Sequence, residues 1–195
     1  MMRRIGLILA AGRGRRMGRT KQLVPWPGEK GAKPLVCAAY DAIRPICDEM
    51  IVVLGHDAEA VTAALGERPF QPVYSEPDGP MFESIRAGLK AAQRSDAKAT
   101  VVLQPGDQPE VAAATLEVLR DWSLKRAVRT IIPEYRGKGG HPVLIPASVV
   151  AVLADADCPS GLGDFWIERP ELCHRVPVED AGVLRDIDTL GDLRE

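Results

Sequence analysis

Short apolar runs alternate with amphipathic runs along the first two thirds of the chain. The apolar runs are rich in β-branched residues, and three of them are apolar almost throughout, which is typical of parallel strands buried on both faces. We expect strands at 5–9, 50–54, 72–74, 100–104 and 127–132, and helices at 34–46, 57–65, 81–93 and 110–125. This alternation predicts an α/β fold with a doubly wound, mostly parallel, Rossmann-like sheet.

The last third of the chain has a different pattern. Two short strands are expected, at 142–145 and 175–178, within irregular chain that is rich in Gly and Pro. We therefore expect a small irregular C-terminal lobe, within a single domain that covers residues 1–195. In the helix at 57–65, Asp57 is a good N-cap residue, and Gly66 follows as a stop signal.

Composition and charge exclude several classes of protein. The 195 residues are 46% hydrophobic and carry a net charge of −2, so neither disorder nor a general affinity for nucleic acid is expected. No apolar run approaches the roughly 20 residues of a membrane-spanning helix, and the apolar run at 5–11 is too short for a secretory signal. The four cysteines form no Cys-x-x-Cys pair, which argues against zinc. We expect a cytoplasmic protein without a membrane or nucleic-acid partner.

The chain is rich in glycine and positive charge directly after its first expected strand. Five of the nine residues at 13–21 are cationic. A Gly-rich turn allows backbone N–H groups to approach phosphates closely, and Arg16 and Lys21 are candidate charge clamps. The loop matches neither the Rossmann pattern, because residue 17 is Met, nor the Walker pattern, because Gly18 is not followed by Lys. The alternative is a solvated basic turn.

Carboxylates follow the fourth expected strand and recur near residue 186. Asp107 stands behind Gly106 at the end of a buried strand, which suits Mg²⁺; alternatively, it caps the helix expected near Glu110. If the chain is extended at Asp186 and Asp188, both carboxylates point to one face, about 6.6 Å apart along the strand. The alternative is that one of them caps a final helix.

Five motifs occur in an order that resembles the MobA-like superfamily of nucleotidyltransferases. They are Leu-Ala-Ala-Gly-x-Gly-x-Arg-Met-Gly-x-x-Lys at 9–21, Val-Val-Leu-Gly-His at 52–56, Gly-Asp-Gln-Pro at 106–109, Gly-His-Pro-Val at 140–143 and Asp-Ile-Asp-Thr at 186–189. The last two motifs, with Ala11, resemble the cytidylyltransferase branch that serves the molybdenum cofactor. The resemblance implies a fold of the nucleotide-diphospho-sugar transferase type.

The resemblance also implies a reaction and a set of site residues. An Mg²⁺-dependent enzyme would transfer CMP from CTP to molybdopterin and release diphosphate, with a molybdoenzyme as a possible partner. Arg16, Lys21 and Asp107 would be catalytic, Asp107, Asp186 and Asp188 would hold the metal, and Gly140 and His141 would contact the acceptor. The nucleotide would be bound by Leu9, Ala10, Ala11, Gly12, Arg13, Gly14, Lys21, Ser84 and Gly106.

Two departures from the family pattern keep other functions open. The segment 78–84 is bulkier than in relatives, and the segment 160–165 lacks the Arg that the cytidylyl branch often carries. The acceptor could therefore be a sugar or polyol phosphate. A third alternative is an accessory protein that binds a nucleotide or cofactor without turnover.

Overall fold

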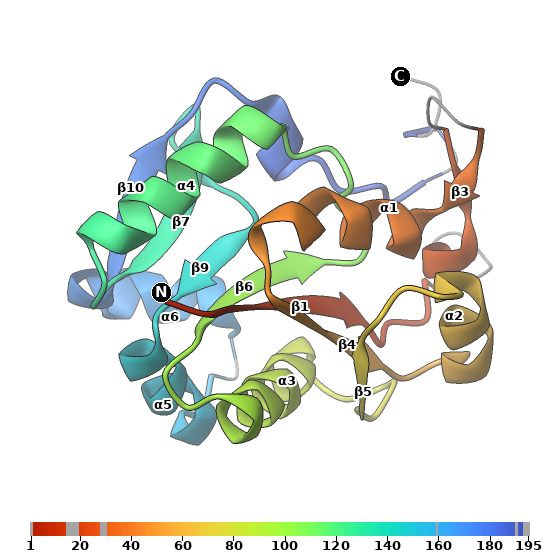
Figure 1. Cartoon of the computed structure of the whole chain (residues 1–195), viewed down its shortest axis with the longest axis horizontal. Helices are drawn as coiled ribbons and strands as arrows, with labels where there is room; N and C mark the ends of the chain where they lie inside the picture. The colour runs from red at the N-terminus through yellow and green to blue at the C-terminus, as the bar shows by residue number, and fades with distance from the viewer. Residues whose placement is uncertain (1, 15–19, 28–30, 159, 190, 193–195) are drawn as a thin grey trace.

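A computed structural model of the chain describes residues 2–14, 20–27, 31–158, 160–189 and 191–192. Its main sheet has the strand order β10-β7-β9-β6-β1-β4-β5 (Figure 1). These strands are β1 (Arg4–Ala10), β4 (Glu49–Leu54), β5 (Gln71–Tyr74), β6 (Thr100–Pro105), β7 (Thr130–Tyr135), β9 (Val143–Ile145) and β10 (Cys173–Pro177). β8 (Lys138–Gly139) pairs with β7, and β2 (Pro25–Trp26) pairs with β3 (Lys33–Pro34) in a separate ribbon. The pairings among β1, β4, β5 and β6 are all parallel, whereas β9 pairs with β6 in the antiparallel direction.

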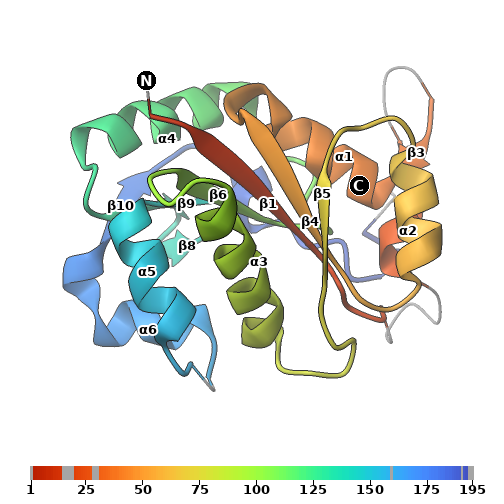
Figure 2. The ribbon, with the colours of Figure 1, turned by 60° about the horizontal axis from the view of Figure 1, so that its bottom comes forward.

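Helices cover both faces of the sheet, as Figures 1 and 2 show. On one face lie α1 (Leu35–Ile43), α2 (Ala58–Leu65) and α4 (Ala113–Lys125). On the other lie α3 (Met81–Ser95), α5 (Ala147–Asp155) and α6 (Leu162–Glu168). This arrangement confirms the predicted doubly wound α/β fold. No helix in the described part of the chain is long and apolar enough to span a membrane.

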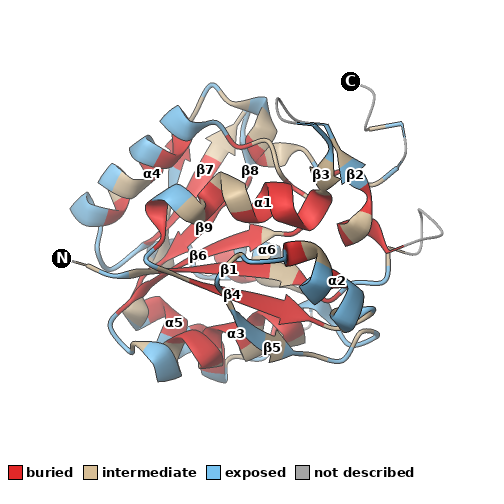
Figure 3. Cartoon of the chain, turned by 45° about the vertical axis from the view of Figure 1, so that its right-hand side comes forward, coloured by how far each residue is buried: buried red, intermediate tan, exposed pale blue. Residues whose placement is uncertain are grey.

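The central strands are buried on both faces, as their apolar sequences predicted. Along β1, Ile5 and Leu7 pack on the α3 side, whereas Ile8 and Ala10 pack on the α1 side. Figure 3 shows these strands as the buried centre of the molecule, with exposed residues mainly on the outer helix faces. Burial on both sides fixes the register, because a slip of one residue would exchange the two faces.

Several elements differ from the sequence-based expectation. β7 begins three residues later than expected, because the Arg129 amide donates to the Arg126 carbonyl in a turn after α4. α4 begins at Ala113 rather than at 110, and the Asp180 carboxylate accepts from the Ala112 amide and the Thr115 hydroxyl there. The expected irregular segment contains α5 and α6. It is therefore partly helical.

The parallel strands β1, β4 and β6 end at the same edge of the sheet. Ala10 is in register with Leu54, and Leu9 with Pro105. The loops after these three strands consequently lie side by side, in the place where open α/β sheets bind their ligands.

Candidate active site

Glycines allow the loops after β4 and β6 to pack directly on the loop after β1. A Cβ atom at Gly55 would lie 2.7 Å from the Ala11 carbonyl oxygen, and one at Gly106 would lie 2.7 Å from the Leu9 carbonyl oxygen. The amides of His56 and Gly106 donate to these same two carbonyls, at 3.1 and 2.9 Å. Any larger residue at 55 or 106 would push the three loops apart.

The backbone of the loop after β1 has its carbonyls bonded and its amides available. The Gly12 carbonyl, like those of Leu9 and Ala11, is bonded within the protein; it accepts from Gln22 Nε2 at 2.9 Å. The amides of Gly12, Arg13 and Gly14, in contrast, have no hydrogen-bond partner among the described residues. Gly12 and Arg13 are exposed, so their amides are open to solvent, and successive backbone N–H groups of this kind can bind an anion.

Lys21 lies between two carboxylates at the edge of this loop. Its Nζ donates to Asp107 Oδ2 and to Asp188 Oδ1, each at 2.6 Å, and its side chain is only 9% exposed. Burial opposes the charge of the ammonium group, but the hydrogen bonds and charges of the two carboxylates outweigh that effect and raise the pKa of Lys21. The side chain of Lys21 therefore remains protonated and positively charged at neutral pH.

The donor set suits a hard divalent cation. Asp107 and Asp188 reach one cationic nitrogen from opposite parts of the chain, so their oxygens converge on a position where positive charge is stabilised. Mg²⁺ prefers such oxygen ligands and commonly uses only one or two carboxylates, with phosphate and water oxygens completing its shell. In keeping with that, no cluster of three or more His, Cys, Asp or Glu side chains suited to a metal occurs in the described ranges. Asp107 and Asp188 are thus the residues that would hold the ion.

The structure separates Asp186 from Asp188, which the sequence placed on one face. The Asp186 carboxylate accepts from Gln108 Nε2, whereas Asp188 contacts Lys21. Between them, Ile187 is fully buried and its amide donates to the Asp107 carbonyl at 3.0 Å. This backbone bond aligns the 186–188 segment with the end of β6. Among the described residues neither alternative of helix capping is seen: at the start of α4 the Ala112 amide donates to Asp180, and after Asp188 the Asp192 carboxylate accepts from the Asp188 amide.

Gly140 and His141, the two residues expected to contact an acceptor, pack against Val183. The His141 amide donates to the Val183 carbonyl at 2.8 Å. A Cβ atom at Gly140 would lie 2.2 Å from that carbonyl oxygen. Burial disfavours the imidazolium form and lowers the pKa of His141 to about 4, although the Asp186 carboxylate acts in the opposite direction. His141 therefore presents a neutral imidazole at neutral pH.

Two grooves flank this region. One, of about 470 Å³, is lined by Tyr135, Ala181, Leu184, Arg185, Asp186 and Asp192. The other, of about 710 Å³, lies between the β2 strand and the segment 179–185. Both have the size of typical small-molecule sites, and the first opens beside the Asp186 carboxylate. It is the better-placed groove for an acceptor next to the cation site.

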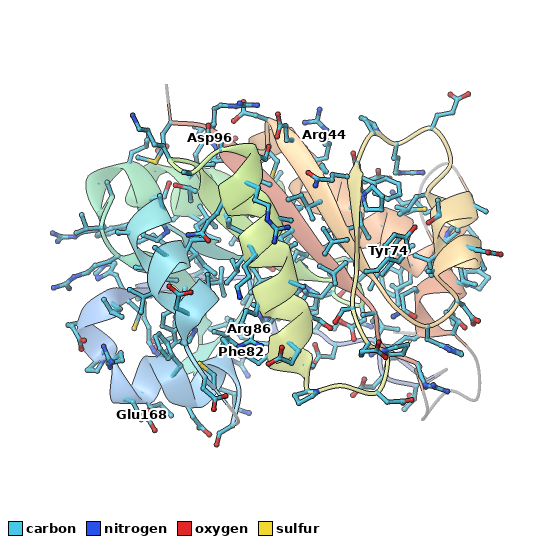
Figure 4. The ribbon with its side chains drawn as sticks, turned by 90° about the horizontal axis from the view of Figure 1, so that it is seen from below. Arg44, Tyr74, Phe82, Arg86, Asp96 and Glu168 are labelled. Atoms are coloured by element: carbon cyan, nitrogen blue, oxygen red, sulfur yellow. The ribbon has the colours of Figure 1, made fainter. Side chains whose placement is uncertain are left out.

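The remaining expected residues divide into three groups. Arg16 lies outside the described residues. Ala10 is fully buried in the core, so its side chain is not available to a ligand, and Leu9 is partly buried against the core. Ser84 is buried in α3, and its hydroxyl hydrogen bonds with that of Ser75 at 2.9 Å. In Figure 4 the first turns of α3, marked by Phe82 and Arg86, lie at the opposite end of the helix from Asp96.

Sequence reasoning missed three residues that shape the site: Thr20, Gln22 and Asp57. The Asp57 carboxylate was expected to cap α2, but it makes no capping bond and accepts from the Thr20 hydroxyl instead. Asp57 itself has a left-handed backbone, with φ of 52°. The only sequence signal for these three residues was that they lie close to Lys21 or Gly55 along the chain. Proximity in sequence does not reveal which side chains point into the site.

A doubly wound sheet whose first loop lies next to a lysine and two carboxylates is an arrangement that can bind nucleotide phosphates. The chain belongs to the MobA-like NTP transferase domain family, whose model matches residues 6–172. It is thus a nucleotidyltransferase of the MobA-like type. The match ends before Asp186 and Asp188.

Individual relatives differ in the activities that their names describe. Nicotine blue oxidoreductase of Paenarthrobacter nicotinovorans is 29% identical over 190 residues, covering 95% of this chain and 92% of that protein. Molybdenum cofactor guanylyltransferase of Pseudomonas putida (strain GB-1) is 33% identical over 153 residues, covering 77% of this chain and 74% of that protein. For three further Pseudomonas guanylyltransferases the match spans 52–53% of their length.

Solved structures show the same fold. Rv0371c from Mycobacterium tuberculosis H37Rv superposes with a TM-score of 0.81 at 31% identity, over 99% of this chain and 96% of that one. A complex of Rv0371c with manganese matches with a TM-score of 0.77 at 29% identity, over 99% and 97% of the two chains.

Proposed function

We propose that the chain transfers CMP from CTP to a phosphorylated acceptor, molybdopterin, in a reaction that requires Mg²⁺ and releases diphosphate. The observation that carries this proposal is the combination of two features: the amides of residues 12–14, which have no partner among the described residues, and Lys21, whose ammonium group lies between Asp107 and Asp188. A triphosphate needs both features: donors for its oxygens and a carboxylate pair for its cation.

The chemistry follows from what these residues offer. An oxygen of the acceptor phosphate attacks the α-phosphorus of the nucleotide in line, and the bond from that phosphorus to the oxygen bridging to the β-phosphate breaks. The attacking oxygen is already ionised at neutral pH, so no protein base has to remove a proton. The amides of residues 12–14 hold the phosphates, and Lys21, with Arg16, neutralises the charge that develops on the leaving diphosphate. When bound at Asp107 and Asp188, Mg²⁺ supplies further charge neutralisation.

The preference for CTP rests on Ala11. The Leu-Ala-Ala-Gly form at 9–12 is associated with cytidylyl transfer, whereas guanylyl-transferring relatives carry Leu-Ala-Gly-Gly. Ala11 is buried, and its Cβ would lie 2.9 Å from a Cβ at Gly55, so its methyl group packs against the Gly55 backbone. The named guanylyltransferase relatives make GTP the competing nucleotide.

A second candidate is transfer to another small phosphate, such as a sugar or polyol phosphate. The segment 78–84 supports it, because Asp78 forms an ion pair with Arg13 at 2.6 Å and links this bulkier segment to the loop after β1. We further propose a cytoplasmic location and, if the acceptor is molybdopterin, a molybdoenzyme as the recipient of the product.

The deciding experiment measures diphosphate release with Mg²⁺ and CTP, GTP, UTP or ATP, each with and without purified molybdopterin. Release that requires CTP and molybdopterin together is the expected result. Release with GTP instead would retain the reaction class and overturn the base preference. Binding of CTP without release in the presence of molybdopterin would overturn the acceptor, and parallel assays with sugar phosphates then test the second candidate.

A further inference from the structure

Three consecutive side chains connect the loop after β1 to three different parts of the site. Thr20 donates to Asp57 after β4, Lys21 donates to Asp107 after β6, and Gln22 reaches back to Gly12 after β1 itself. Lys21 has an obvious role in charge neutralisation. Gln22 carries no charge, yet its side chain donates a hydrogen bond to the backbone of the glycine-rich loop, at Gly12.

The amide group of Gln22 is buried and only half satisfied. The residue is 7% exposed, and its Nε2 donates to the Gly12 carbonyl at 2.9 Å. Its Oε1 is buried and has no hydrogen-bond partner among the residues that the structure describes. A buried, unpaired carbonyl oxygen is destabilising, so an apolar side chain of similar length would suit the stability of this site at least as well. A polar residue held at a cost to stability is typical of a functional position.

The bond to Gly12 determines which way the next amide points. In a trans peptide the carbonyl of one residue and the N–H of the following residue point in opposite directions. Gln22 holds the Gly12 carbonyl on the protein side, so the Arg13 amide faces away, toward solvent, where it has no partner among the described residues. Gly12 and Arg13 are both exposed. Because glycine has no side chain to restrict rotation, this peptide depends on Gln22 for its orientation.

We infer that Gln22 is a positioning residue, which presets the Arg13 amide to donate to a phosphate group of the nucleotide. The inference rests on the proposed function in one respect, namely that the loop binds the phosphates of a nucleoside triphosphate. It adds a residue that acts through the backbone and not by contact with the ligand.

The test uses Gln22→Met, with Gln22→Leu as a second variant should the first fail to fold. Both remove the donor and the unpaired oxygen together. The matched control is Tyr40→Phe, because the Tyr40 hydroxyl also donates a part-buried hydrogen bond to a backbone carbonyl, that of Pro69 at 2.7 Å, but the residue belongs to α1 and, within the described ranges, its side chain makes no hydrogen bond to residues 12–14. Binding of CTP with Mg²⁺ is measured by calorimetry, and thermal stability by the unfolding midpoint.

We expect the Gln22 variants to bind CTP about tenfold more weakly, the equivalent of one lost hydrogen bond to a charged group, with an unfolding midpoint equal to or above that of the wild type. The Arg13 amide, followed by NMR, should shift on addition of inorganic diphosphate in the wild type and shift less in the variants. Tyr40→Phe should show the reverse pattern, with a lower midpoint and unchanged affinity.

The outcomes separate the inference from the proposed function. Wild-type affinity in the Gln22 variants would overturn the positioning role, as would a lower midpoint with unchanged affinity, which indicates a structural role only. If the wild-type protein binds neither CTP nor diphosphate, the proposed function fails, and the positioning role fails with it.

Discussion

The Nζ atom of Lys21 lies 2.6 Å from Oδ2 of Asp107, although 86 positions separate the two residues in the sequence. Lys21 belongs to the short 3₁₀ helix Lys21–Leu23, whereas Asp107 follows β6. The parallel pairing of β1 with β6 brings these segments to one edge of the sheet. The contact therefore depends on the correct pairing of the central strands. Substitutions at these two residues test whether the proposed cation site and phosphate loop act together.

Replacement of Asp107 by Asn should abolish turnover while the fold persists. Asn keeps an oxygen that can accept from Lys21 but removes the charge that a divalent cation requires, so diphosphate release should fall at least ~100-fold. Release assays and circular dichroism of the same preparation check both statements. Asp121→Asn, at an exposed carboxylate on α4, is the control. Normal activity in Asp107→Asn would remove the metal hypothesis.

Replacement of Lys21 by Met should destabilise the protein and make its stability depend on Mg²⁺. Without the ammonium group, the carboxylates of Asp107 and Asp188 lose the cation that they share. Both are about one-third exposed, with side-chain exposures of 32% and 40%, so solvent screens their repulsion, and we expect a loss of about 1–2 kcal/mol. Millimolar Mg²⁺ should restore part of it by binding the folded state.

Thermal unfolding with and without Mg²⁺ measures this effect. Lys33→Met is the matched control, because it also removes a lysine that pairs with a carboxylate, but at a more exposed site and with a different partner, Asp41. An Mg²⁺ response equal in both variants would contradict the prediction.

Alanine at Gly140 should disrupt the acceptor side of the site. Its Cβ would overlap the backbone of Val183, with 2.2 Å to the carbonyl oxygen, so the chain at 140–141 must move, at a cost of about 3 kcal/mol. Gly163→Ala provides the comparison, since a Cβ there meets nothing within 4 Å and the residue lies in α6, where Ala is the better helix former. Urea unfolding of both variants measures the difference. Equal stabilities would show that the 140–141 segment is not fixed against Val183.

Protonation of His141 should destabilise the protein in mild acid. Its pKa in the folded state, about 4, lies below the ordinary value of 6.5, so the unfolded chain binds the proton more readily. The stability from neutral His141 is present above pH 6.5 and is lost as the pH falls toward 4, by about 2 kcal/mol. His141→Asn should therefore lose less stability than the wild type between pH 6.5 and 4.5, measured by urea unfolding. Parallel curves for the two proteins would refute this assignment.

The strands of the parallel sheet could be predicted because they follow from local pattern. Continuous apolar runs identified the parallel strands, and the rule that ligands bind at their carboxyl ends then directed attention to residues 9–14 and 107. The helices α5 and α6 were not predicted, because their helical form becomes clear only from which residues are buried in the folded structure. In α5 the residues Val149, Val150, Leu153 and Ala154 are buried at helical spacing, but a short run rich in valine does not distinguish a helix from a strand.

Partner choice within the site could not be predicted for a related reason. Spacing alone placed Asp186 and Asp188 together, whereas Gln108 bonds one of them and Lys21 the other. Likewise, Asp57 has the sequence of a helix cap, but its left-handed backbone and the Thr20 hydroxyl determine where its carboxylate lies. Such competition among polar partners depends on which side chains the fold brings within reach, and a single sequence does not record it.

The backbone bond between Ile187 and Asp107 has a consequence for biosynthesis. Asp188 follows Asp107 by 81 positions, so at the usual rates of translation it leaves the ribosome roughly 4–16 s later. During that interval the glycine-rich loop, Lys21 and Asp107 can all be in place while the second carboxylate does not yet exist. On the proposed function, stabilisation by nucleotide and metal is thus reserved for chains extended at least to residue 188, and shorter nascent chains depend on the sheet alone.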